Sequence, residues 1–265
     1  MRAHCPSRRN EDIAVMNIEY HKHYSSHLAR EMEFKVYGHA GLPVMFIPCQ
    51  SGRFFDFENF KMLDHWAQWI EEGRVTVFAI DCIDDEAWAA KNADNRWRIE
   101  NHERWYNYVV EEMVPTIRHL SGMANGYDQL IIPFGCSMGA MHAANLFFRR
   151  PDVFGGCLAL SGLYDNNEFF PGYCDDLVYN NCPNLYLANL PQDHFYIDLY
   201  NQRKIVICVG QGAWEGPLLE STRWLDSVLK SKGIHAQVEY WGTDVAHDWD
   251  WWYKQVAHYV PQFLA

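Results

Sequence analysis

The sequence is poor in basic residues and has no long apolar run. Its 265 residues include 22 Lys and Arg against 34 Asp and Glu, for a net charge of −12. A nucleic-acid interface needs clustered Lys and Arg, so this balance argues against a nucleic-acid partner. The longest apolar stretches, such as residues 130–134, are far shorter than the roughly 20 residues that cross a bilayer. We therefore expect no membrane span.

Paired cysteines are also missing. The eight cysteines show no C-x-x-C spacing, and several lie in apolar runs, where Cys acts as a small hydrophobe. This usage predicts reduced thiols rather than a disulfide framework.

The first residues lack a secretory signal. They carry charges but neither an apolar segment nor a small-residue cleavage site. The sequence therefore predicts a cytoplasmic protein with a disordered lead over residues 1–15. Met16 opens the first stretch that resembles folded sequence, so translation starts at either Met1 or Met16.

Apolar, β-rich runs alternate with longer amphipathic stretches along most of the chain. This alternation predicts the α/β class, with a mostly parallel sheet flanked by helices on both faces. The expected strands are residues 33–37, 44–48, 75–80, 129–134, 156–160, 204–209 and 237–241. The expected helices are residues 58–72, 102–119, 138–149, 218–231 and 249–263. The length fits one domain over residues 16–265.

Residues 164–202 interrupt this alternation. They hold three prolines, several Asn and Asp, and no long periodic run. Such excursions lie beyond the carboxyl ends of the strands, where ligands bind in open α/β sheets. We expect a lid-like insertion of short helices and loops that forms part of a pocket roof.

The most informative motif is G-x-S-x-G, formed by Gly135, Ser137 and Gly139. An apolar strand precedes it and a helix rich in small residues follows, which is the setting of a nucleophile elbow. A serine at such a turn projects above the sheet. The helix N-terminus beneath it supplies an amide, that of Met138, and a positive dipole end for a developing oxyanion. The pattern predicts Ser137 as a nucleophile.

A general base is expected after the last strand, because hydrolases with this elbow order their triad as serine, acid, histidine. His247 follows the strand at residues 237–241 and precedes an aromatic helix. Most of the other twelve histidines lie in polar or helical stretches with ordinary structural interpretations. The sequence thus predicts His247 as the base.

The acid should lie just past the strand at residues 204–209. Glu215 is the only carboxylate in that loop, and a glutamate can orient an imidazole as an aspartate does. Glu220, about one turn into the next helix, and Asp244, on the loop of His247, are the alternatives. We expect Glu215.

The second oxyanion donor is expected in the loop after the early strand at residues 44–48. Either the Gln50 or the Ser51 amide fits this role, and the sequence does not choose between them.

Asp81, Asp84 and Glu86 form a cluster of carboxylates, and such groups can bind a metal ion. No histidine or second carboxylate pair stands at ligand spacing. We therefore expect neither a metal nor a cofactor. Instead these carboxylates should accept hydrogen bonds from loop and helix-end amides, with Asp84 and Asp85 as N-cap candidates.

The chain resembles the putative-esterase branch of the α/β-hydrolases, which includes S-formylglutathione hydrolases, feruloyl esterases, enterochelin esterases and mycolyltransferases. The resemblance covers nearly all of the chain from Met16 onward, and it rests on residues 16–21, 30–39, 81–88, 135–139 and 247–252. It implies an α/β-hydrolase fold and reaction through a serine, but it leaves the substrate open because the branch acts on diverse esters. Many members carry an aspartate near the position of Ala213, and this chain departs from them there. Mycolyltransferases place a glutamate slightly later, which favours Glu215.

The predicted function is therefore that of a serine esterase. It would cleave carboxylic esters or thioesters of a small-molecule substrate through an acyl-enzyme on Ser137. Two alternatives remain open. One is an acyltransferase, in which an alcohol replaces water, and the other is a catalytically silent hydrolase fold used for binding, as the departure at Ala213 allows. Association into a homo-oligomer is also open.

Overall fold

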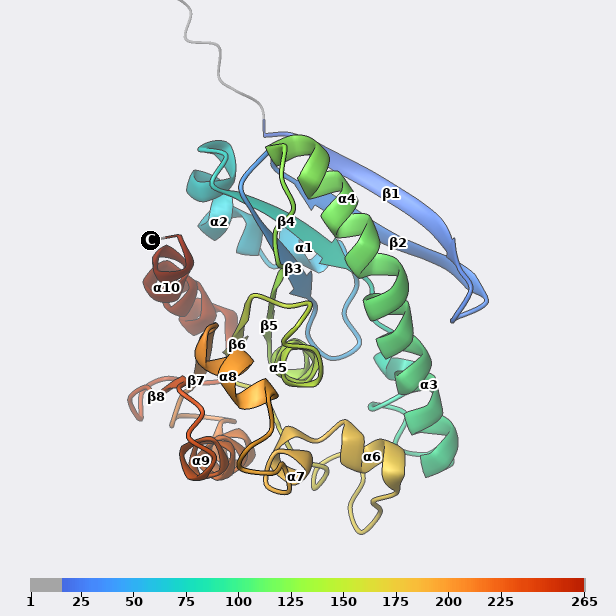
Figure 1. Cartoon of the computed structure of the whole chain (residues 1–265), viewed down its shortest axis with the longest axis vertical. Helices are drawn as coiled ribbons and strands as arrows, with labels where there is room; N and C mark the ends of the chain where they lie inside the picture. Colours follow the sequence, from blue (N-terminus) through green and yellow to red (C-terminus); the bar gives the residue numbers. More distant parts are fainter. Residues whose placement is uncertain (1–15, 265) are drawn as a thin grey trace, which may run out of the picture.

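The computed structural model describes residues 16–264, and the predicted lead over residues 1–15 lies outside them. An eight-stranded sheet of order β1-β2-β4-β3-β5-β6-β7-β8 runs through the molecule (Figure 1). Its strands are β1 Ile18–Ser25, β2 Arg30–Tyr37, β3 Leu42–Ile47, β4 Val75–Ile80, β5 Ile132–Cys136, β6 Gly156–Leu160, β7 Lys204–Val209 and β8 Gln237–Tyr240. The β1–β2 and β2–β4 pairs are antiparallel and every later pair is parallel. The predicted mostly parallel sheet is confirmed.

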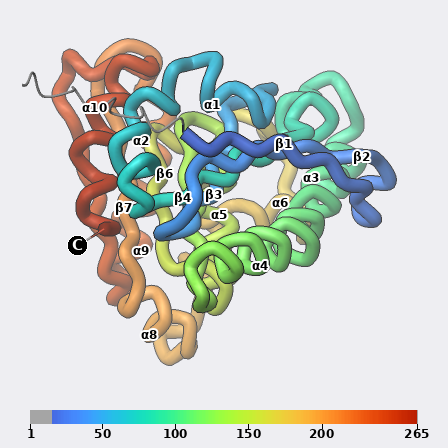
Figure 2. Tube along the Cα trace, turned by 90° about the horizontal axis from the view of Figure 1, so that it is seen from above, coloured from blue at the N-terminus to red at the C-terminus, as the bar shows by residue number. Residues whose placement is uncertain are grey.

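Two apolar layers pack against the two faces of the sheet. One layer is formed by α1 Asp56–Asn59, α2 Met62–Glu71 and α10 Trp249–Tyr259. The other is formed by α3 Asn95–Tyr108, α4 Val114–Asn125, α5 Met138–Arg149, α8 Tyr196–Asn201 and α9 Gly216–Ser231. Figures 1 and 2 show α4 and α10 on opposite sides of the molecule. Alternate strand residues face each layer, so the central strands are apolar throughout.

The structure corrects several expected boundaries. Strand β1 was not predicted, because five of its eight residues are exposed and it pairs only at the edge of the sheet. The helix expected over residues 102–119 begins at Asn95, where the Asp94 side chain accepts a hydrogen bond from the Trp97 amide. It passes through a π-helical turn, η2 Val109–Met113, before α4. The helix expected over residues 58–72 is divided into α1 and α2.

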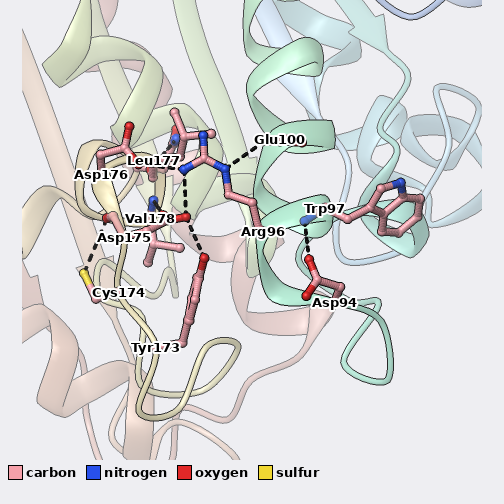
Figure 3. A network of polar contacts seen from close by, with 11 residues as sticks. Asp94, Arg96, Trp97, Glu100, Tyr173, Cys174, Asp175, Asp176, Leu177 and Val178 are labelled. Atoms are coloured by element: carbon pink, nitrogen blue, oxygen red, sulfur yellow. Dashed lines mark hydrogen bonds and ion pairs between the residues drawn. The ribbon is translucent and has the colours of Figure 1, made fainter.

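The stretch predicted as an insertion folds into α6 Asp176–Asn180, α7 Pro183–Tyr186 and α8. Ion pairs join it to α3: the guanidinium of Arg96 contacts Asp175 at 3.0 Å and Asp176 at 2.7 Å (Figure 3). Nearby, Arg98 donates to the Phe169 carbonyl at 2.8 Å. These contacts hold the segment against α3, and its place in a pocket roof stays a prediction.

Two further expectations concern the state of the cysteines and membrane spans, and the structure bears on both for residues 16–264. Each of the seven cysteines in this part of the chain is free, and burial raises the pKa of the Cys136 thiol well above its usual value. No helix within residues 16–264 combines the length and the apolar character that a membrane span requires.

Candidate active site

The turn between β5 and α5 holds Ser137 in a sparsely populated backbone conformation. Its φ of 57° and ψ of −125° lie outside the regions that L-residues ordinarily occupy. Such strain is found at functional sites, where the surrounding structure maintains it. Here the Ser137 amide donates to the Leu160 carbonyl of β6 at 2.9 Å, and α5 begins at the next residue.

Two glycines make this turn sterically possible. A Cβ on Gly135 would lie 2.3 Å from the carbonyl carbon of Gly139, and a Cβ on Gly139 would lie 2.2 Å from the Ile47 carbonyl oxygen. Both distances are far below van der Waals contact. The motif therefore permits close approach of α5 to the ends of β3 and β5.

His247 lies in the loop between β8 and α10, with its Nε2 2.9 Å from Oγ of Ser137. Backbone hydrogen bonds join this loop to the one after β7. The His247 amide donates to the Ala213 carbonyl at 2.9 Å, and the Gly212 amide donates to the Val245 carbonyl at 2.8 Å. The loop that carries the histidine is thus fixed to the loop that carries Glu215.

The structure brings one of the three candidate acids to His247. Glu215 immediately precedes α9 and is fully buried. Its Oε2 lies 3.5 Å from Nδ1 of His247, longer than an ordinary hydrogen bond but within reach of an ion pair. Glu220 and Asp244 are exposed, and within residues 16–264 neither contacts His247 through a hydrogen bond or ion pair.

Two residues that sequence reasoning did not assign to the site complete this arrangement. The Ser161 hydroxyl donates to Oε1 of Glu215 at 2.6 Å, and Nε1 of Trp252 donates to Oγ of Ser161 at 3.1 Å. The Trp252 ring also meets the His247 ring edge-to-face, with centroids 4.9 Å apart. Ser161 directly follows β6, so a polar residue at the carboxyl end of a strand was the available signal.

The expected oxyanion donors lie on two elements. Met138 is the first residue of α5, so its amide has no acceptor within the helix. In the loop after β3, the amides of Gln50 and Ser51 donate to no acceptor found in residues 16–264. Ser51 has a φ of 59°, and its hydroxyl donates to a carboxylate oxygen of Asp85.

The acidic cluster near this loop makes hydrogen bonds and ion pairs. Asp81 accepts from Nε of Arg53 at 2.7 Å and from the Phe54 amide at 3.1 Å. Asp84 accepts from His142 rather than capping a helix: the short 3₁₀ turn there has Ile83 at its N-cap, without a side-chain cap. Over residues 16–264, no group of three potential ligands has the geometry of a metal site.

A cavity of about 270 Å³ opens beside the same loop. Ser51 and Gly52 form part of its wall, and the acidic segment after β4 forms another part. Of the candidate oxyanion donors only Ser51 lines this cavity, and neither Ser137 nor His247 belongs to its wall.

The sheet order, the strained serine turn and the helices on both faces define the fold class as that of an α/β-hydrolase, as predicted. A family model described as putative esterase matches residues 25–263. The chain belongs to this family of putative esterases, and the resemblance inferred from its sequence is confirmed.

Solved structures agree on the fold. They include a ferulic acid esterase, with a TM-score of 0.70 and 14% identity, covering 94% of this chain and 98% of that one. An S-formylglutathione hydrolase from Agrobacterium tumefaciens matches with a TM-score of 0.65 and 16% identity over 95% and 96% of the two chains. The ferulic acid esterase AmCE1/Fae1A from Anaeromyces mucronatus matches with a TM-score of 0.66 and 13% identity over 97% and 94%. None of the curated proteins compared with the chain matches it.

Proposed function

We propose that the protein hydrolyses small carboxylic esters or thioesters through an acyl-enzyme on Ser137. The observation that carries this proposal is the 2.9 Å contact between Oγ of Ser137 and Nε2 of His247. It places a hydroxyl within proton-transfer reach of an imidazole. Glu215, on the other side of that imidazole, supplies the third group that a nucleophile–base pair needs for orientation.

The first half of the reaction forms the acyl-enzyme. Nε2 of His247 takes the Ser137 proton as Oγ attacks the acyl carbon. Negative charge develops on the former carbonyl oxygen, and the Met138 amide, with that of Gln50 or Ser51, donates hydrogen bonds to it. The tetrahedral intermediate then collapses. The bond to the alcohol or thiol breaks, and the departing group takes the proton from His247.

The second half releases the acid. His247 removes a proton from a water molecule, whose oxygen attacks the acyl carbon. Collapse of the second intermediate releases the carboxylic acid and returns the proton to Ser137. In both halves Glu215 holds the tautomer of His247 that keeps Nε2 free, and its charge stabilises the imidazolium.

A fluorophosphonate probe tests the proposal, because it modifies an activated serine covalently. We expect the probe to label Ser137, and we expect turnover of p-nitrophenyl esters by the wild type. Ser137→Ala should lose both, whereas Ser231→Ala, which removes a hydroxyl at the end of α9, should lose neither. Undiminished turnover in pure Ser137→Ala would refute the nucleophile.

The same experiment separates the alternatives. Absence of both labelling and turnover in the wild type would favour a silent binding fold. Addition of an acceptor alcohol, with analysis of the products, distinguishes an acyltransferase, which forms a new ester, from an esterase, which forms the free acid. A series of short and long acyl chains then defines the acyl group.

A further inference from the structure

The segment after β4 contacts both elements that carry the proposed oxyanion donors. Asp85 accepts a hydrogen bond from the hydroxyl of Ser51, in the loop after β3. Oδ1 of the neighbouring Asp84 lies 2.9 Å from Nε2 of His142. His142 lies on α5, one turn beyond Met138. Two successive carboxylates therefore connect the loop to the helix.

Burial makes the contact between Asp84 and His142 a fixed one. Their side chains are 4% and 1% exposed, and the His142 ring packs against those of His102 and Trp105, with centroids 5.1 and 5.0 Å apart. Loss of one partner of a buried polar pair leaves the other without a hydrogen bond, so such pairs resist separation. The segment after β4 is thereby held at a set distance from α5.

The loop after β3 is held at a second place by the same segment. Asp81 accepts hydrogen bonds from the Phe54 amide and from Nε of Arg53. Together with the bond from Ser51 to Asp85, this fixes the loop on both sides of Gly52. Such support is needed because the left-handed conformation of Ser51 is unfavourable for a residue with a side chain.

We propose that Asp84 and His142 are positioning residues that set the spacing between the two oxyanion donors. The donors are the Met138 amide and the amide of Gln50 or Ser51, so the inference rests on the proposed function. Neither positioning residue touches the reacting atoms. Because oxyanion donors act on charge that develops in the transition state, an error in their spacing lowers kcat and leaves KM largely unchanged.

Two variants of His142 differ in whether they keep a hydrogen-bond donor to Asp84. His142→Leu loses the ring N–H, whereas His142→Gln retains an N–H donor near the position of Nε2. We expect His142→Leu to lower kcat by about 10- to 100-fold, which is at or below the roughly 10²- to 10³-fold cost of removing an oxyanion donor, because the donors are displaced rather than lost. His142→Gln should recover most of that loss. All kcat values are expressed per active site titrated with the fluorophosphonate, which removes any effect of a misfolded fraction.

A second pair compares carboxylates of similar burial. Asp84→Ala removes the proposed positioning group, and Asp226→Ala removes a carboxylate that pairs with Lys230 on α9. Both should lower the Tm, but only Asp84→Ala should lower kcat per titrated site. If Asp84→Ala does not fold, Asp84→Asn replaces it, with a smaller loss of kcat expected.

Inhibition by a trifluoromethyl ketone gives a readout that a purely structural role would leave unchanged. Oγ of Ser137 adds to this carbonyl, His247 takes the proton, and the resulting oxyanion needs the same two donors. We expect its affinity to fall in parallel with kcat/KM in Asp84→Ala and His142→Leu, while the carboxylate product binds as before. Unchanged ketone affinity and unchanged kcat per titrated site, with only the Tm lowered, would overturn the inference. A wild type without labelling or turnover would refute the proposed function itself, before any variant is compared.

Discussion

Ser161 and Glu215 are joined by a hydrogen bond of 2.6 Å that the serine hydroxyl donates to Oε1 of the carboxylate. The other oxygen, Oε2, is the one nearest His247. The bond therefore fixes the rotation of the carboxylate and leaves Oε2 for the imidazole. Nε1 of Trp252 donates to the same hydroxyl. The buried Ser161 hydroxyl therefore accepts a hydrogen bond from Trp252 and donates one to Glu215.

Ser161→Ala should lower kcat by roughly 10-fold, because the buried carboxylate of Glu215 loses a charge-assisted hydrogen bond and its fixed orientation. KM should stay within a few-fold. Steady-state kinetics on a p-nitrophenyl ester measures both.

Ser221→Ala is the matched control, since Ser221 is also a buried serine that donates to a buried carboxylate, Asp165. It should lower the Tm without changing kcat. If Ser161→Ala keeps the same kcat as Ser221→Ala and the wild type, the contact between Ser161 and Glu215 contributes to folding alone.

Glu215→Gln should keep the shape of the side chain and lose the charge that stabilises the His247 imidazolium. By analogy with the acid of serine proteases, we expect kcat to fall by roughly 10²–10⁴. Asp244→Asn, on the loop of His247, should cost much less because Asp244 is exposed and, within residues 16–264, makes no hydrogen bond or ion pair with His247.

The comparison of these two variants can also contradict the assignment. A large loss of kcat in Asp244→Asn, together with a nearly normal kcat in Glu215→Gln, would show that Asp244 is the acid of the triad. Mild effects in both would point to a different carboxylate.

Gly139→Ala should prevent correct formation of the elbow. The added Cβ would lie 2.2 Å from the Ile47 carbonyl oxygen and 2.6 Å from that of Pro48. Both are backbone atoms, so relief requires α5 to move away from β3. We expect a lower Tm and loss of fluorophosphonate labelling. Gly126→Ala, where no atom lies within 4 Å of the added Cβ but φ is 78°, should lower the Tm and leave labelling intact.

The buried strands and the elbow could be predicted from the sequence because their signals are local. Apolar runs marked β4, β6 and β7 at their observed bounds, and glycine spacing marked the turn at Ser137. Strand β1 escaped prediction because its residues are mostly exposed and polar. Its place in the sheet depends on pairing with β2, which a local pattern does not show.

Partners of buried polar groups were harder to predict, because they come from distant parts of the chain. Asp84 meets His142, 58 residues away, and Asp85 meets Ser51, 34 residues away. The sequence suggested loop and helix-end amides as the partners of these carboxylates, and the side chains that they meet were not predicted. The position of Glu215 beside His247 could be predicted because its loop offers a single carboxylate.

His102 should make the stability of the protein fall on mild acidification. It is buried against α5, with Nε2 3.1 Å from Oδ1 of Asn181. Burial holds the pKa of His102 well below its ordinary value of 6.5, and the nearby charges of His142 and Arg149 lower it further. In the folded protein His102 therefore stays neutral at pH values at which the same residue is protonated in the unfolded chain. This contribution to stability is fully present above about pH 6.5 and is lost as the pH falls below it, by up to about 1.4 kcal/mol per pH unit.

The measurement is the free energy of unfolding from urea titrations at about pH 7.5, 6.5 and 5.5, in wild type and in His102→Gln. Glutamine can still donate to Asn181 but does not titrate, so the variant should lose less stability between the two lower pH values. Titrating groups that lie away from His102 and its neighbour His142 contribute equally to both proteins and cancel in the difference. His258→Gln, at an exposed position on α10, should keep the wild-type slope. Parallel slopes for wild type and His102→Gln would show that His102 takes up its proton in the folded state, against the expectation from its burial.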